Sequence, residues 1–222
     1  MSVQPPRKVT PVSTIMLGAY VLVGLVYEVA AVRFREKLRK LAKVTLMPVL
    51  GIFYAVAAPH PLVVTLVAIA FSWLGDILLI RKAEPRFFRL GMAAFLLSHV
   101  FYIVTLIVLT SSLHVPALVV SIGVAVVAEV LLVRLIDPPA AMRVPIIVYG
   151  VVILAMSVCA LQYALAAASL RSVLVFIGSV VFIFSDVWMT YFAFGKKPKY
   201  FDAITMVPYI IAQGLIVYGL AV

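Results

Sequence analysis

Charged residues and cysteine are scarce in this chain of 222 residues. Only 12% of the residues are charged, whereas 66% are hydrophobic. A composition this apolar excludes an ordinary soluble domain and indicates a polytopic membrane protein. Cys159 is the only cysteine, so an intrachain disulfide is excluded. Cysteine usage therefore does not distinguish an oxidising from a reducing compartment.

Several motifs that carry chemistry are missing as well. The chain has no Gly-x-Ser-x-Gly nucleophile elbow, no Gly-rich phosphate loop, and no His-x-x-x-His or cysteine pair for zinc. We therefore expect neither a metal ion nor a cofactor. Nucleic acid is not an expected partner, because the Lys and Arg residues form no basic patch interleaved with aromatic residues. Intramembrane aspartyl proteases carry Gly-x-Gly-Asp, whereas this chain has Trp73-Leu74-Gly75-Asp76.

Long apolar runs make up most of the chain, and a helix needs about 20 apolar residues to cross a bilayer. The runs are separated by charged stretches and by proline-containing turns such as Pro59-His60-Pro61 and Asp137-Pro138-Pro139. We predict an all-α fold, with a single integral membrane domain over residues 1–222. Its eight predicted transmembrane helices are 12–32, 41–58, 61–81, 87–110, 115–136, 143–166, 170–194 and 201–221.

The basic residues are distributed unevenly between the two ends of these helices. Fifteen of the 18 Lys and Arg residues lie around the turns after the first, third, fifth and seventh predicted helices. The positive-inside rule assigns those turns to the cytoplasm and both termini to the other side. The basic face could also attract anionic membrane lipids, but orientation alone explains the charge.

A weak internal repeat relates residues 12–110 to residues 115–221. Asp76 and Asp186 are 110 residues apart, and so are His99 and Tyr209. Lys43 and Arg143 each begin an even-numbered predicted helix, 100 residues apart. Because each half would contain four helices, the two halves would insert the same way up, as a parallel repeat.

Two aspartates, Asp76 and Asp186, lie inside apolar runs. An ionised Asp at the centre of a membrane helix costs about 2.5–3.5 kcal/mol, so neither is expected to face lipid. Both fall in the cytoplasmic half of the bilayer, and so do Lys43, His99, Arg143 and Tyr209. Helical spacing adds Ser72 to the face of Asp76, Tyr102 to that of His99, and Gln213 to that of Tyr209.

These polar residues predict one cavity that opens toward the cytoplasm. Each residue also has a structural interpretation, since a buried Asp can pair with Lys43 or Arg143, and His99 can bond across two helices. Glu28 and Glu129 lie nearer helix ends, where we expect them to pair with Lys or Arg. Pro208 is expected to kink the last helix beside Tyr209.

The polar residues sit in two sets with characteristic neighbours. The first comprises Phe71-Ser72, Gly75-Asp76, Leu79-Ile80, Phe88, Gly91, Phe95, His99 and Phe101-Tyr102, and the second comprises Gly178, Phe182, Ser185-Asp186, Tyr209, Ala212-Gln213 and Ile216. These sets resemble the signatures of the YhhN-like lysoplasmalogenase family. The segments Lys43–Pro48 and Arg143–Tyr149 are similar too, although Val44 replaces a proline and Pro208 replaces the first residue of the usual Tyr-Tyr.

The resemblance implies hydrolysis of the vinyl ether of a lysophospholipid, 1-alkenyl-glycerophosphoethanolamine or -choline, to a fatty aldehyde and the glycerophospho base. Asp76 and Asp186 would supply the acid and the base, in an order that the sequence leaves open. The residues Ser72, His99, Tyr102, Ser185, Tyr209 and Gln213 would orient water and substrate, and Lys43 and Arg143 would hold the phosphate.

A different class of protein fits the same carboxylates. A proton-coupled transporter or lipid permease would use Asp76 and Asp186 as a proton relay. The sequence does not specify an oligomeric state or a head-group preference. It also does not distinguish a bacterial inner membrane from the eukaryotic endoplasmic reticulum and other endomembranes.

Overall fold

The computed structural model describes residues 10–221 and forms eight helices within them. No strand occurs in this part of the chain. The helices are α1 (Pro11–Val32), α2 (Glu36–Ala57), α3 (Val63–Leu79), α4 (Pro85–Leu109), α5 (Val115–Ile136), α6 (Ala140–Ala167), α7 (Leu170–Phe194) and α8 (Phe201–Ala221). The all-α prediction is therefore confirmed, and each predicted helix corresponds to one observed helix.

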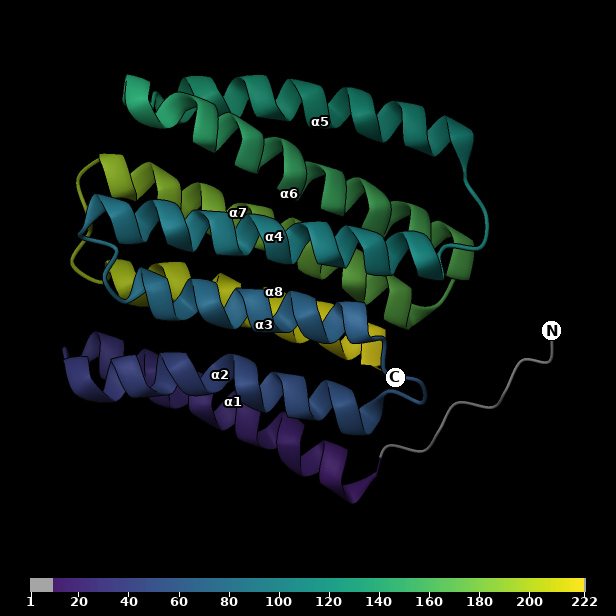
Figure 1. The fold of residues 1–222 in the computed structure, drawn as a ribbon, viewed down its shortest axis with the longest axis horizontal. Coiled ribbons are helices and arrows are strands. Elements are labelled where there is room, and N and C mark those ends of the chain that lie inside the picture. Colours follow the sequence, from purple (N-terminus) through teal and green to yellow (C-terminus); the bar gives the residue numbers. More distant parts are fainter. Residues whose placement is uncertain (1–9, 222) are drawn as a thin grey trace.

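The helices lie nearly side by side, in successive layers (Figure 1). The pair α1 and α2 covers one side of the molecule, and α5 lies outermost on the other side, beyond α6. Between them, α3 and α8 form one layer and α4 and α7 the next. The connections α1–α2, α3–α4, α5–α6 and α7–α8 share one end of the bundle, which we call the basic end because it carries most of the Lys and Arg residues.

Seven of the eight helices in residues 10–221 are long and apolar enough to cross a membrane. The exception is α3, whose 17 residues span about 26 Å at 1.5 Å per residue, slightly less than a hydrocarbon core of about 30 Å. The chain is therefore an integral membrane protein, and the crossing of the bilayer by α3 stays a prediction.

The two largest differences from the boundaries that hydropathy predicts are at the starts of helices. Helix α2 begins at Glu36 rather than at residue 41, and α6 begins at Ala140 rather than at residue 143. The charged residues after Glu36 favour helix as much as apolar residues do, so a hydropathy criterion stops too early. The break between α1 and α2 is only a short turn, in which Phe34 takes a left-handed φ of 55°.

Two kinds of contact hold the central helices together. Helices α7 and α8 pack backbone to backbone, because Gly178 lies against the backbone of Ala212 and Ile216. Helices α3 and α4 are linked by hydroxyl pairs, Thr65 with Thr105 at 3.0 Å and Ser72 with Ser98 at 2.7 Å. By contrast, α5 has no buried residue. The central four helices therefore form a close-packed frame, with α5 at its edge.

Candidate active site

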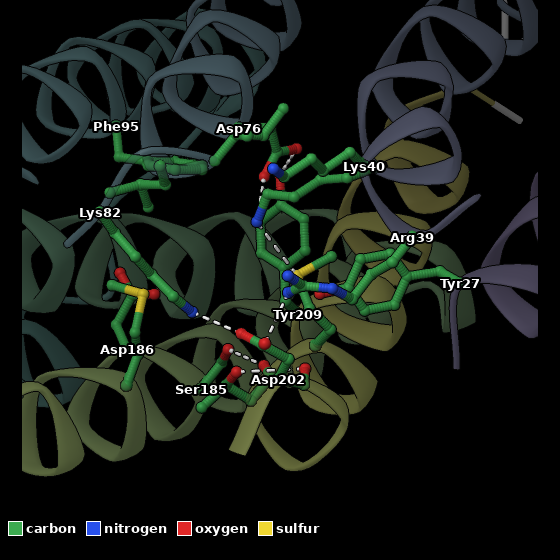
Figure 2. Close-up of a pocket in the computed structure, with 16 residues that line it drawn as sticks. Tyr27, Arg39, Lys40, Asp76, Lys82, Phe95, Ser185, Asp186, Asp202 and Tyr209 are labelled. Atoms are coloured by element: carbon green, nitrogen blue, oxygen red, sulfur yellow. Dashed lines mark hydrogen bonds and ion pairs between the residues drawn. The ribbon is translucent and has the colours of Figure 1, made fainter. Parts of the chain in front are cut away.

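A polar pocket opens at the basic end, where α3 ends and α8 begins. Its volume of about 60 Å³ is enough for water molecules, each of which needs roughly 10–15 Å³. Helices α1, α2, α3, α4, α7 and α8 and the α3–α4 connection all contribute to its wall. The charged residues that line it are Arg39, Lys40, Lys43, Asp76, Lys82, Asp186 and Asp202 (Figure 2).

Asp76 is held by a cation and a phenol. It is almost completely buried on α3, one turn after Ser72. The Lys43 Nζ atom lies 3.2 Å from its Oδ1, and the Tyr209 hydroxyl donates to its Oδ2 at 2.7 Å. The same ammonium group also lies 3.3 Å from the sulfur of Met206. An adjacent ammonium ion and a hydrogen-bond donor both favour the ionised carboxylate.

Asp186 has a different set of neighbours. It is buried on α7, and the Tyr149 hydroxyl of α6 donates to its Oδ2. Within residues 10–221 it forms no ion pair with a Lys or Arg. Its carboxyl group therefore lacks the cation that Asp76 has, although both aspartates line the same pocket.

A chain of hydrogen bonds lies deeper in the bundle. The Tyr102 hydroxyl donates to Gln213 Oε1 at 3.1 Å, and Gln213 Nε2 donates to the Ser72 hydroxyl at 3.0 Å. Ser72 bonds Ser98, whose hydroxyl donates to the Ala68 carbonyl at 2.8 Å. We call this series the Tyr102–Ala68 chain. It ties α3, α4 and α8 together, so it fixes the face that Asp76 presents.

The mouth of the pocket is a cluster of ion pairs. Asp202 lies 2.5 Å from Arg39 and 2.7 Å from Lys82, which approach it from different sides (Figure 2). Lys82 belongs to the α3–α4 connection. Burial lowers the pKa of Lys82 from 10.5 to about 8, although the charge of Asp202 opposes this shift. Ion pairs at the mouth therefore connect three segments: α2, the α3–α4 connection and α8.

The remaining predicted residues lie in different places. Ser185 lines the pocket and donates to the Thr205 carbonyl at 3.1 Å, near Pro208 in α8. His99 is buried beside the Phe182 and Tyr149 rings, at 4.7 and 5.6 Å, and its ring nitrogens make no hydrogen bond with the described residues. Arg143 is 56% exposed, pairs with Asp137 at 3.4 Å, and does not line the pocket.

The expected ion pairs of Glu28 and Glu129 are wrong. Among residues 10–221 neither carboxylate forms an ion pair, and the Oε1 atom of Glu28 is buried without a hydrogen-bond partner. Glu28 lies about one turn and Glu129 about two turns before the end of its helix, so both carboxylates are set back from the Lys and Arg residues of the connections. Glu129 lies instead against Gly150 of α6, where a side chain would overlap its carboxylate.

No group of three or more His, Cys, Asp or Glu residues that could hold a metal ion occurs within residues 10–221.

The tripeptide Pro116-Ala117-Leu118, a sequence also found in intramembrane aspartyl proteases, lies in the first turn of α5. That turn is at the opposite end of the bundle from the polar pocket.

Sequence reasoning missed several residues of the site. Tyr149 belongs to the segment that carries the family resemblance, but its contact with Asp186 depends on how α6 is rotated against α7. Arg39 and Lys82 were interpreted only as residues that set the membrane orientation, so their position at the mouth of the polar pocket was not predicted. Asp202 had a usable signal, because it is an acidic residue in the first turn of a helix at the basic end.

A membrane bundle with two buried aspartates around one polar pocket defines a helical integral membrane protein with a candidate acid–base site. Residues 38–220 match the YhhN family. Since this match covers most of the chain, the protein belongs to the YhhN family. No curated protein and no solved structure matches the chain.

Proposed function

We propose that this protein hydrolyses the vinyl ether bond of lysoplasmalogens, releasing a fatty aldehyde and glycerophosphoethanolamine or glycerophosphocholine. Membership of the YhhN family supports a hydrolase of this kind. The observation that carries the proposal is the contrast between the two aspartates. Asp76 has Lys43 beside it, whereas Asp186 has the Tyr149 phenol and, among residues 10–221, no Lys or Arg partner. Two carboxyl groups in unlike environments are typical of an acid and a base that act together.

In this mechanism Asp186 is the acid, because it has no cation to hold it ionised. Its proton goes to the β-carbon of the alkenyl group, and the ether carbon becomes an oxocarbenium ion. Asp76, held ionised by Lys43, stabilises that cation and accepts a proton from the water that adds to it. The hemiacetal then returns its hydroxyl proton to Asp186 as the bond to the glycerol oxygen breaks. Asp76 protonates that oxygen, so both carboxyl groups end as they began.

The phosphate of the substrate would bind at the mouth of the pocket. Lys43 is engaged with Asp76, and Arg143 lies outside the pocket, so neither is well placed to hold it. Arg39, Lys40 and Lys82 line the pocket nearer its mouth. Charge-assisted hydrogen bonds from such groups suit a phosphate, and binding would compete with the ion pairs to Asp202.

The direct test is hydrolysis of a 1-alkenyl lysolipid in deuterated water. Protonation at carbon places one solvent deuterium on the carbon next to the aldehyde carbonyl, provided that the aldehyde is reduced as it forms. The ester-linked lysolipid and the saturated 1-alkyl lysolipid should remain intact. An aldehyde without deuterium, or ester cleavage at a similar rate, would exclude this mechanism.

Substitution of the aspartates tests their roles. Asp186→Asn and Asp76→Asn should each lower kcat by about 10²–10⁴-fold, the range typical of general acid–base groups. Asp76→Asn leaves the Lys43 ammonium without its partner, so Asp76→Asn/Lys43→Met serves as a folding check. The matched control is Asp137→Asn on the exposed α5–α6 turn, which should keep normal activity. Transport of intact lysolipid across vesicles, without hydrolysis, would favour the transporter interpretation instead.

A further inference from the structure

A second pocket lies on the other side of Asp186, between α5, α6 and α7. Most of its wall is aliphatic, and its volume is about 40 Å³. We call it the α5–α7 groove. Its aliphatic wall includes Leu132, Val133, Ile153, Ile183 and Val187, and its polar lining residues are Glu129, Tyr149, Asp186 and Thr190. Asp186 lines both this groove and the polar pocket, so the carboxyl group of the proposed acid stands between a polar and an apolar space.

The groove lies at the depth of lipid chains. Asp186 is eight residues before the end of α7, which is about 12 Å along the helix from the basic end. Helix α5, which forms the outer wall, is long and apolar enough to cross a membrane and has no buried residue. It is also the outermost helix on its side of the bundle (Figure 1). The groove therefore borders the hydrocarbon of the bilayer and not the aqueous phase.

The proposed reaction requires an apolar space in this position. The carbon that Asp186 protonates is the second carbon of the alkenyl chain, so the rest of the chain has to lead away from Asp186. The polar pocket takes the glycerophospho group, because its mouth carries Arg39, Lys40 and Lys82. The hydrocarbon chain of the lipid then continues on the other side of Asp186, where aliphatic side chains line the groove.

We propose that the α5–α7 groove holds the hydrocarbon chain of the substrate lipid, which enters sideways from the bilayer between α5 and α7. This inference rests on the proposed function, and it names where that substrate binds. A larger cavity of about 280 Å³ at the basic end is also partly apolar, with Phe88, Met142 and Phe194 in its wall. Neither Asp76 nor Asp186 lines that cavity, so a chain bound there has no direct path to the acid.

Photolabelling tests the chain site without relying on catalysis. The probe is a saturated 1-alkyl lysophosphoethanolamine, which is not cleaved, with a diazirine in the first third of its chain. Specific labelling is the part that an excess of unlabelled 1-alkyl lipid abolishes. It should fall on Leu132, Val133, Ile183 or Val187. Leu132→Trp should reduce it about tenfold, whereas Met142→Trp in the other cavity should leave it unchanged. Labelling at Phe88, Met142 or Phe194, or labelling unaffected by Leu132→Trp, would overturn the inference.

Chain-length selectivity provides the second test. Burial of one CH₂ group contributes about 0.8 kcal/mol, a factor of roughly four. Excluding two such groups with Leu132→Trp should lower kcat/KM for long alkenyl chains about fifteenfold relative to short ones, and Leu132→Ala should not. Equal ratios in Leu132→Trp and Met142→Trp would contradict the chain site. Groove labelling in a protein without hydrolytic activity would contradict the proposed function and leave the chain site intact.

Discussion

Lys82 is a residue at the mouth of the pocket whose charge depends on pH in the neutral to mildly basic range. Its side chain bridges the α3–α4 connection to Asp202, and burial lowers its pKa to about 8. In the unfolded chain the same amine keeps its proton to about pH 10.5. Between these values the unfolded state binds more protons, so the free energy of unfolding contributed by Lys82 rises with pH. Loss of the proton therefore weakens the charge at the mouth without destabilising the fold.

We predict that KM for the lysolipid rises severalfold between pH 7 and pH 9, because the mouth loses one of its cations. In Lys82→Arg the guanidinium stays charged throughout this range, so KM should remain nearly constant. Steady-state kinetics of both proteins in the same buffers provide the measurement. A KM that rises equally in Lys82→Arg would assign the pH dependence to another group.

The individual residues differ in how far the sequence could predict them. Asp76 and Asp186 were recognisable because each is a carboxylate within an apolar run, and membrane burial of such a group is costly. The bond between Tyr209 and Asp76 joins residues 133 positions apart, and only helix packing determines that they meet. Tyr149 carried no comparable signal, because a tyrosine in a membrane helix is more often a packing or interfacial residue.

At the level of helices, α7 and α8 approach each other closely at Gly178. A Cβ atom at Gly178 would lie 3.0 Å from both the Ala212 carbonyl oxygen and the Ile216 nitrogen, and 2.8 Å from Ile216 Cγ1. Backbone atoms cannot move aside as a flexible side chain can. The hydrogen bond from Ser185 to Thr205 spans the same two helices, so their spacing also affects the pocket.

We predict that Gly178→Ala lowers the melting temperature in detergent by several degrees, since overpacking costs about 1–3 kcal/mol. The matched control is Gly123→Ala in α5, where no described atom beyond the helix itself lies within 4 Å of the added methyl group. Alanine favours helix over glycine, so this control should keep or raise the melting temperature. Equal losses in both variants would show that the α7–α8 contact is not the cause.

Helix positions were more predictable than the relations between helices. Apolar runs and proline turns located all eight helices within residues 10–221, because the bilayer sets the length of each apolar run. Hydropathy said nothing about which helices touch, and the parallel repeat of residues 12–110 and 115–221 stays a prediction. The sequence did not predict the short length of α3, because two predicted residues at each of its ends lie in the connections.

For the molecule as a whole, the basic end should face the cytoplasm. Single cysteines at Lys37 and Lys197 should react with a membrane-impermeant maleimide only from the cytoplasmic side, in a Cys159→Ser background. Cysteines at His60 and Ser112, at the opposite end, should react only from the other side. The termini themselves, predicted to lie on that other side, include residues 1–9 and 222, which lie outside the described residues. Reaction of Lys197→Cys from the non-cytoplasmic side would invert the orientation.

The direction of the hydrogen bonds in the Tyr102–Ala68 chain has a consequence for proton supply. Ser98 gives its hydrogen to the Ala68 carbonyl, so Ser72 has to donate to Ser98, and Gln213 donates to Ser72. Every hydrogen points the same way, the series passes through an amide, and it ends on a carbonyl that has no proton to release. Such a series does not conduct protons. The proposed mechanism returns a proton to Asp186 in each turnover, so the site needs no proton from this series. Exchange of that proton with solvent would occur through the polar pocket, and turnover would respond to the acidity of the compartment at the basic end and not to that of the opposite compartment.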